Sequence, residues 1–149
     1  MREKYYTDAF SEYEKRLGAY CRFELSEVGE TRLPEAPSEK EVSAALDREA
    51  DLILRAVPKD AFLVAMCVEG RQMPSEKMAE LIRERKNSGK PKLCFVIGGS
   101  FGLSNIVKAR ADMRLSMSQM TFPHHLARVM LAEQVYRGFK INEGSAYHK

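Results

Sequence analysis

The 149-residue sequence lacks several features that would assign it to a common functional class. It has only three cysteines, Cys21, Cys67 and Cys94, and no CxxC spacing, so neither a disulfide framework nor a structural zinc site is expected. It has no apolar run of membrane-spanning length, and its start, MREKYYTDAF, contains no apolar segment of the signal-peptide type. We therefore expect a cytoplasmic protein with buried free thiols and no membrane association.

The common nucleotide-binding motifs are also absent, because the sequence contains neither GxGxxG nor a Walker motif. No metal site is predicted, since His124 and His125 are adjacent and neighbouring helical residues diverge by about 100°. No serine lies on a recognisable nucleophile elbow, so nucleophilic catalysis is not favoured. Glu133 and Arg137 are four residues apart, which by default makes them an ordinary helix ion pair.

The charged residues are distributed unevenly along the chain. The net charge of +3 divides unevenly, because residues 1–74 carry 11 basic and 15 acidic groups, whereas residues 75–149 carry 13 basic and 6 acidic groups. A basic C-terminal half would favour a phosphate-backbone partner, although solvated surface charge without a partner is an equally ordinary explanation.

The chain is long enough for one compact domain with a substantial core, so we predict a single domain over residues 1–149. Apolar residues at helical spacing indicate helices, and short alternating or wholly apolar runs indicate strands. The predicted helices are Arg2–Leu17, Ser38–Val57 after a Ser38 capping box, a helix capped by Ser75 that ends near Lys86, a helix capped by Ser104 that ends near Arg110, and Pro123–Arg137; the predicted strands are Tyr20–Val28, Ala61–Val68, Leu93–Ile97 and Arg114–Met117. The first helix has an apolar stripe and is expected to face the core; the stripe consists of Tyr6, Phe10, Tyr13 and Leu17.

Two of these strands, AFLVAMCV and LCFVI, are apolar throughout, which is typical of strands covered on both faces. Because strands alternate with helices, we predict an α/β fold with a mostly parallel sheet flanked by helices. The loop GGSFG follows the second strand, and open α/β sheets bind ligands at the carboxyl ends of their strands. This loop is therefore a candidate binding site, although a glycine pair also marks a plain strand-to-helix turn.

The stretch from Leu115 to Arg137, LSMSQMTFPHHLARVMLAEQVYR, is the second candidate site. Its first part lacks periodicity, whereas the apolar residues after Pro123 recur at helical spacing, so a loop is predicted to lead directly into a helix. Thr121 is expected to cap this helix and Gly138 to end it. A helix N-terminus has unpaired N–H groups that can hold a polar or anionic ligand.

Three ordered motifs, namely the strand followed by GGSFGLS, the stretch just described and the terminal AYHK, resemble the RlmH family of SPOUT-class methyltransferases. EYEKRL and LVAMCVEG extend the similarity over essentially the whole chain. Members transfer a methyl group from S-adenosylmethionine to N3 of a pseudouridine in large-subunit ribosomal RNA. The resemblance implies a homodimer, a ribosomal RNA or ribosome partner, and a SPOUT-type α/β fold whose C-terminal part forms a trefoil knot.

Matching positions imply where this chain would bind its ligands. The implied cofactor-binding residues are Met66, Gly98, Met117, Ser118, Gln119, Met120, Thr121 and Phe122, and the implied RNA-binding residues are Arg128, Arg137, Tyr147, His148 and Lys149. Without the resemblance, the aperiodic tail Ile141–Lys149 would be interpreted as a frayed terminus.

Three of the matched positions are implied to be catalytic, namely His124, Arg137 and His148. Methyl transfer from a sulfonium needs mainly positioning, and the proton on the target nitrogen must be removed without a metal. His124 or His148 could accept this proton, and the residues alone do not choose between them or exclude water. Arg137 could stabilise negative charge on the base or hold phosphate.

The family pattern begins with a further short apolar strand, whereas this sequence starts at the segment equivalent to Arg2–Tyr6. We therefore expect the domain to lack the first family strand, which would leave an open sheet edge or an apolar gap. Two other functions stay open. The chain could be another nucleotide-binding α/β protein that uses GGSFG for phosphate, or a basic ribosome-associated RNA-binding protein without catalysis.

Overall fold

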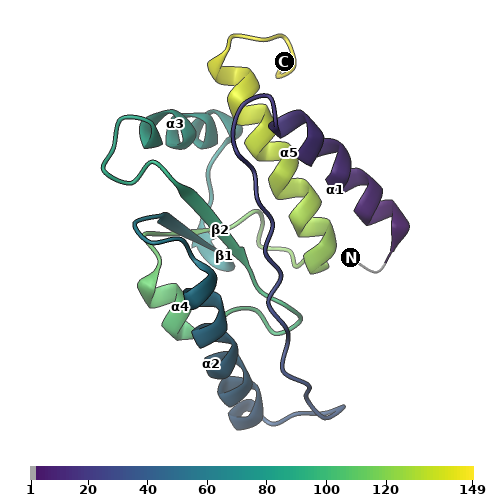
Figure 1. Cartoon of the computed structure of the whole chain (residues 1–149). Helices are drawn as coiled ribbons and strands as arrows, with labels where there is room; N and C mark the ends of the chain where they lie inside the picture. The colour runs from purple at the N-terminus through teal and green to yellow at the C-terminus, as the bar shows by residue number, and fades with distance from the viewer. Residues whose placement is uncertain (1–2) are drawn as a thin grey trace. The chain divides into compact units, whose positions relative to one another are not determined.

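The computed structural model describes residues 3–149, which divide into two compact units (Figure 1). The helical unit comprises residues 3–25, 73–89 and 121–149, and the sheet unit comprises residues 26–72 and 90–120. The elements in chain order are α1 (Lys4–Leu17), α2 (Glu39–Ala56), β1 (Phe62–Arg71), α3 (Ser75–Arg85), β2 (Leu93–Ile97), α4 (Asn105–Arg110), β3 (Met113–Leu115) and α5 (His124–Asn142). The single domain over 1–149 stays a prediction. In the part of the chain that the structure describes, no helix has the length and apolar character needed to span a membrane.

The sheet unit contains three parallel strands in the order β2-β1-β3, with the helices α2 and α4 beside them (Figure 1). The predicted strand Leu93–Ile97 matches β2 at both ends. Buried residues from both helices and from the strands form one core, which consists of Ala50, Leu63, Ala65, Val96, Leu103 and Val107. The predicted α/β fold with a parallel sheet flanked by helices is confirmed.

Helix α2 begins with the predicted capping box. The Ser38 hydroxyl accepts a hydrogen bond from the backbone N–H of Glu41, and the Glu41 carboxylate accepts one from the backbone N–H of Ser38, each at 3.1 Å. Both groups would otherwise be unpaired at the helix start, so the box fixes where the chain turns into α2.

Replacing Ser38 with alanine is therefore expected to lower the free energy of unfolding by about 1 kcal/mol. Chemical denaturation followed by circular dichroism measures this change. The matched control is Ser43→Ala, because Ser43 is exposed inside the same helix, where alanine is the better helix former. Equal stability of the two variants would show that the box does not contribute.

The strand predicted over Tyr20–Val28 is wrong, because residues 21–34 form no regular secondary structure and no described strand pairs with them. Side chains in this segment nevertheless alternate between facing the core and facing solvent, as the sequence pattern indicated. Cys21 and Phe23 pack on the helical core, whereas Arg22 and Glu24 are exposed and form an ion pair at 2.8 Å. The pattern thus indicates which side of the segment faces the core, but an unpaired extended segment satisfies it as well as a strand does.

The end of β1 also differs from the prediction, since the strand continues through Glu69 and Gly70 to Arg71. Met66 and Arg71 both pair with Leu115, so the residues between them bulge away from β3. Gly70 makes this possible, because a Cβ built on it would lie 2.7 Å from the carbonyl carbon of Leu115. In this place glycine marks a close approach of two backbones rather than a strand end.

Two other boundaries need correction. The strand predicted over Arg114–Met117 is β3, which ends at Leu115, two residues before the predicted end, because the chain there enters a hydrogen-bonded loop. Ser75 does not cap α3 but is its first residue, with Pro74 at the N-cap, and its hydroxyl donates to Gln134 Oε1 at 2.6 Å. The Ser75 hydroxyl therefore links α3 to α5 and does not cap α3.

The helical unit packs α1 and α3 against α5 (Figure 1). The predicted apolar stripe of α1 faces α5, where Phe10 and Leu17 are buried together with Ala132. The prediction that α1 is a core-facing helix is confirmed for Lys4–Leu17, and Arg2, its predicted start, lies outside the described residues.

Both predicted limits of α5 are wrong. Pro123, not Thr121, occupies the N-cap, and the helix continues past Gly138 to Asn142. Gly138 is buried inside the helix against α3, where an added Cβ would lie 2.6 Å from Ile82 Cδ1. This glycine permits close helix packing, and the left-handed residue beyond the helix end is Gly144, with φ +77°.

Candidate functional site

The strand register brings the candidate segments of the sheet unit to one edge. Met66 in β1 is aligned with Ile97, the last residue of β2, and with Leu115, the last residue of β3. Gly98 follows Ile97 directly, and Met117 lies two residues after Leu115. The parallel order therefore places these positions together at the carboxyl edge of the sheet, where open α/β sheets bind ligands.

Gly98 begins a tight turn whose backbone folds back on itself. Gly102 has φ +83°, and its backbone N–H donates to the Gly99 carbonyl at 3.1 Å. A Cβ built on Gly98 would lie 2.4 Å from both the carbonyl carbon and the oxygen of Gly102. Glycine is thus required at position 98 by the turn itself, before any ligand is considered.

Accordingly, Gly98→Ala is expected to lower the free energy of unfolding by roughly 1–3 kcal/mol, because the added methyl group must displace backbone atoms. Urea denaturation of purified protein measures the loss. Gly29→Ala is the matched control, since a Cβ there meets nothing within 4 Å. A fully stable Gly98→Ala protein would contradict this account of the turn.

The loop after β3 is held by its own serines. Ser116 donates its hydroxyl hydrogen to the Ser118 carbonyl at 2.9 Å, and the Ser118 hydroxyl accepts from the Met120 backbone N–H at 3.0 Å. Met120 exposes 73% of its surface, and Phe101 in the glycine turn exposes 51%. The sheet unit therefore presents ordered loops with exposed apolar side chains, whereas Thr121 and Phe122 belong to the helical unit.

A hollow of about 440 Å³ lies between residues 30–35 and the glycine turn. Met66, Gly98 and Met117 do not line it, so it does not coincide with the implied cofactor position. Three carboxylates and one arginine line it, and the carboxylate of Glu30 lies directly against Gly99, where an added Cβ would collide with it. Negative charge next to the glycine turn disfavours an anionic ligand on this side.

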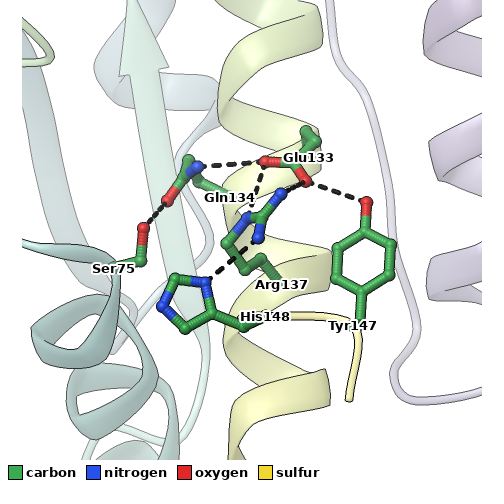
Figure 2. Close-up of polar contacts among 6 residues, drawn as sticks. All are labelled: Ser75, Glu133, Gln134, Arg137, Tyr147 and His148. Atoms are coloured by element: carbon green, nitrogen blue, oxygen red, sulfur yellow. Dashed lines mark hydrogen bonds and ion pairs between the residues drawn. The ribbon is translucent and has the colours of Figure 1, made fainter. Parts of the chain in front are cut away.

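The C-terminal tail of the helical unit is folded onto α5 and is not frayed (Figure 2). The Tyr147 hydroxyl donates to Glu133 Oε2 at 2.9 Å, and its ring meets the Tyr136 ring edge-on with centroids 5.1 Å apart. Burial, reinforced by the Glu133 hydrogen bond, raises the pKa of Tyr147 to about 12, so the hydroxyl stays protonated at neutral pH. The tail therefore has defined contacts despite its lack of sequence periodicity.

Arg137 is the centre of this arrangement (Figure 2). Glu133 receives hydrogen bonds from Arg137 Nε at 3.2 Å and from Nη2 at 2.7 Å, which confirms the helix ion pair predicted from their spacing. Arg137 Nη1 lies 3.0 Å from His148 Nδ1, and the Arg137 guanidinium lies 4.9 Å from the centroid of the Tyr147 ring. The pair is thus part of a larger network.

The network closes on α3 at two places. Gln134 joins it to Ser75, because Gln134 Nε2 donates to Glu133 at 3.0 Å and Gln134 Oε1 accepts from Ser75. His148 Nε2 lies 2.8 Å from Glu76 Oε1. Hydrogen bonds therefore run from α3 through α5 and the tail back to α3, and we call this set of side chains with Tyr147 the tail network.

His124 is not part of the tail network, because it begins α5 and Arg137 lies 13 residues further along the helix. The His124 and His125 rings do not diverge as expected, since their centroids are 4.1 Å apart. Burial, followed by the charges of His124 and Arg128, lowers the pKa of His125, whose Nδ1 has no partner among the described residues. Among residues 3–149, no three His, Cys, Asp or Glu side chains could together hold a metal ion.

Sequence reasoning missed Glu76, Gln134 and Ser75 as members of the tail network. Glu133 was considered only as half of an ion pair. No local signal could have found Glu76, because its partner His148 lies 72 residues further along the chain. The implied RNA-binding residues Arg128 and Lys149 lie in the same helical unit, Arg128 half-buried and Lys149 exposed.

A comparison with protein families matches residues 1–148 to a family described as predicted SPOUT methyltransferase. The chain belongs to the SPOUT methyltransferase family. It is 45% identical over 149 residues to ribosomal RNA large subunit methyltransferase H of Clostridium beijerinckii, and 44% identical over 149 residues to the protein of that name from Bacillus pumilus. Each alignment covers 100% of this chain and 94% of the relative. The resemblance found from the sequence motifs is confirmed, and SPOUT membership implies the knotted form of the α/β fold.

Proposed function

We propose that this protein transfers a methyl group from S-adenosylmethionine to N3 of a pseudouridine in large-subunit ribosomal RNA, and that it acts in the cytoplasm as a homodimer. Membership of the SPOUT methyltransferase family and the names of the relatives support the reaction and the RNA. The observation that carries the proposal is the tail network, which holds an arginine, a tyrosine and a histidine together at the partly exposed surface of α5.

The carboxyl edge of the sheet is where the cofactor would bind. Met66, Gly98 and Met117 meet there, and exposed Met120 offers an apolar surface for an adenine ring. Backbone groups of Ser118 to Met120 would hold the polar parts, except the Met120 N–H, which already donates to the Ser118 hydroxyl. When bound, the sulfonium supplies an electrophilic methyl group, so the protein need only position the reactants and let the N3 proton leave.

The tail network would act on the RNA side. Three of the five N–H groups of Arg137 are engaged by Glu133 and His148, which fixes the plane of the guanidinium. The other two N–H groups could donate to a uracil-type carbonyl, where negative charge develops as N3 loses its proton. Tyr147 can stack on an unpaired base, and Arg128 and Lys149 can contact phosphate.

The length of α5 supports a dimer. His124 and Arg137 are 13 residues apart in one helix, which separates them by about 20 Å at 1.5 Å per residue. Within one chain these two residues cannot both contact the same base. If both serve one site, as the family positions imply, a second copy of the chain must supply one of them.

The nucleotide-binding alternative is disfavoured by Glu30, whose carboxylate lies against Gly99 where a phosphate would have to bind. A positively charged sulfonium compound meets no such repulsion. Calorimetric titration separates the two: we expect saturable binding of S-adenosylmethionine and none of ATP or NAD. Binding of ATP or NAD without S-adenosylmethionine would overturn the proposed cofactor.

Transfer of a tritium-labelled methyl group from S-adenosylmethionine to purified ribosomal particles tests the proposed reaction. We expect label in large-subunit RNA and none in small-subunit RNA. Binding to the large subunit without any label would instead support the ribosome-associated protein that lacks catalysis. Separate reactions with free RNA, isolated large subunits and whole ribosomes identify the form of the substrate.

A further inference from the structure

His148 is held at both ring nitrogens by groups whose hydrogen-bonding roles are fixed. Its Nδ1 lies 3.0 Å from Nη1 of Arg137, and its Nε2 lies 2.8 Å from Oε1 of Glu76. The guanidinium can only donate, and an ionised carboxylate can only accept. Both contacts are therefore hydrogen bonds only if Nδ1 carries the lone pair and Nε2 carries the proton.

Glu76 is suited to this role by its place in the fold. It is the second residue of α3, where the helix N-terminus favours negative charge. Hydrogen bonding from its own backbone N–H, and then from His148, lowers the pKa of Glu76, so its carboxylate is ionised at neutral pH. At neutral pH the ionised carboxylate of Glu76 can thus accept a hydrogen bond from His148 Nε2–H.

We propose that Glu76 is a positioning residue that, with Arg137, locks His148 in the Nε2–H tautomer, so that His148 orients Arg137 and does not accept the substrate proton. The tautomer itself does not depend on the proposed methyltransferase function, but the role of His148 in catalysis rests on it. A general base needs a free lone pair directed at the proton that it removes. The lone pair of His148 is directed at Arg137, and its other nitrogen already has a proton.

The lock gives Arg137 two fixed contacts on different sides, because Glu133 holds Nε and Nη2 while His148 holds Nη1. A donor held in place before the reaction stabilises developing charge better than one that must reorganise. Removal of Glu76 is therefore expected to affect turnover through Arg137, although Glu76 itself does not contact the substrate. The N3 proton must leave to a group other than His148 or to water.

The tautomer can be measured in the free protein by nitrogen-15 NMR of the histidine ring nitrogens. The sequence has only three histidines, so His148→Asn assigns the His148 signals by their disappearance. At a pH where the ring is neutral, we expect an unprotonated Nδ1 and a protonated Nε2. Glu76→Gln should keep this pattern because its amide oxygen still accepts, whereas Glu76→Ala should shift it towards a mixture of tautomers.

Glu80→Ala is the matched control, since Glu80 is a carboxylate on the same helix that pairs with Lys77 instead. It should leave the His148 signals unchanged. Glu76 is exposed, and circular dichroism verifies that its variants stay folded. A protonated Nδ1 in the unaltered protein, or an unchanged pattern in Glu76→Ala, would overturn the lock.

The pH dependence of kcat/KM tests the catalytic part. Asparagine places a carbonyl oxygen near the position of Nδ1 and has no basic nitrogen, so His148→Asn should retain more activity than His148→Ala and the same pH profile. Equal loss in both variants, or loss of a limb of the profile, would make His148 the base. If the unaltered protein transfers no methyl group while the NMR pattern is found, the proposed function fails but the lock stands.

Discussion

Methyl transfer to large-subunit ribosomal RNA is expected to fall roughly a hundredfold to a thousandfold when Arg137 is replaced by methionine, the usual cost of removing one donor aimed at developing charge. The substitution keeps much of the side-chain length but removes every N–H that Glu133 and His148 now hold in place. The loss should appear mainly in kcat, because the interaction strengthens as N3 becomes negative. Initial rates at saturating S-adenosylmethionine measure it.

Two further variants distinguish the effect of the planar Arg137 guanidinium from the effect of its positive charge. Arg137→Lys keeps the positive charge but lacks the planar fork, so it should recover only a small part of the rate. Arg83→Met removes an exposed arginine of α3 outside the tail network and should leave the rate nearly unchanged. Equal rates for Arg137→Met and Arg83→Met would show that Arg137 contributes only general positive charge.

Removal of Tyr147 to Lys149 is expected to give the second large effect, a loss of methyl transfer with S-adenosylmethionine affinity unchanged. Stacking of Tyr147 on an unpaired base would contribute about 1–3 kcal/mol, which corresponds to a loss of roughly fivefold to 150-fold. Arg137 would also lose its contact with His148. Ribosome methylation measures the first quantity, and calorimetry measures cofactor affinity.

Removal of Lys149 alone is the matched control for this deletion, because it keeps both Tyr147 and His148. It should lower RNA affinity slightly and in a salt-dependent way. The longer deletion should lower the free energy of unfolding by roughly 2–4 kcal/mol, since it removes the hydrogen bond from Tyr147 to Glu133, the contact of the Tyr147 ring with Tyr136 and both contacts of His148. Full activity without residues 147–149 would mean that the tail has no role, and lost cofactor binding would mean that it closes the pocket.

The fold could be predicted where local chemistry decides the structure. The run LCFVI is apolar, has the length of a strand and is followed by a glycine pair, which together indicate a strand, and Ser38 with Glu41 defines a helix start within four consecutive residues. Gly138 was misjudged because its role depends on contact with Ile82, which no local pattern records. The segment Tyr20–Val28 was wrongly predicted as a strand. Its alternation of polar and apolar residues indicates which side chains face the core, but not whether the backbone pairs with another strand.

Of the two candidate sites, one could be placed from the sequence and the other could not. The carboxyl-edge position of Gly98 follows from the rule for parallel sheets, so the sequence was sufficient to place it. The physical reason given by the structure is different, since the missing side chain makes room for Gly102. The tail network could not be predicted, because it joins α3, α5 and the C-terminus through contacts between residues far apart in sequence.

Nucleoside mass spectrometry of ribosomal RNA, after incubation of ribosomes with the protein and S-adenosylmethionine, shows directly whether the protein methylates N3 of a pseudouridine. A new methyl group is expected on N3 of a pseudouridine in large-subunit RNA, formed by the unaltered protein and nearly absent with Arg137→Met. Methylation of another nucleoside, methylation confined to small-subunit RNA, or equal product from the Arg137→Met protein would contradict this expectation.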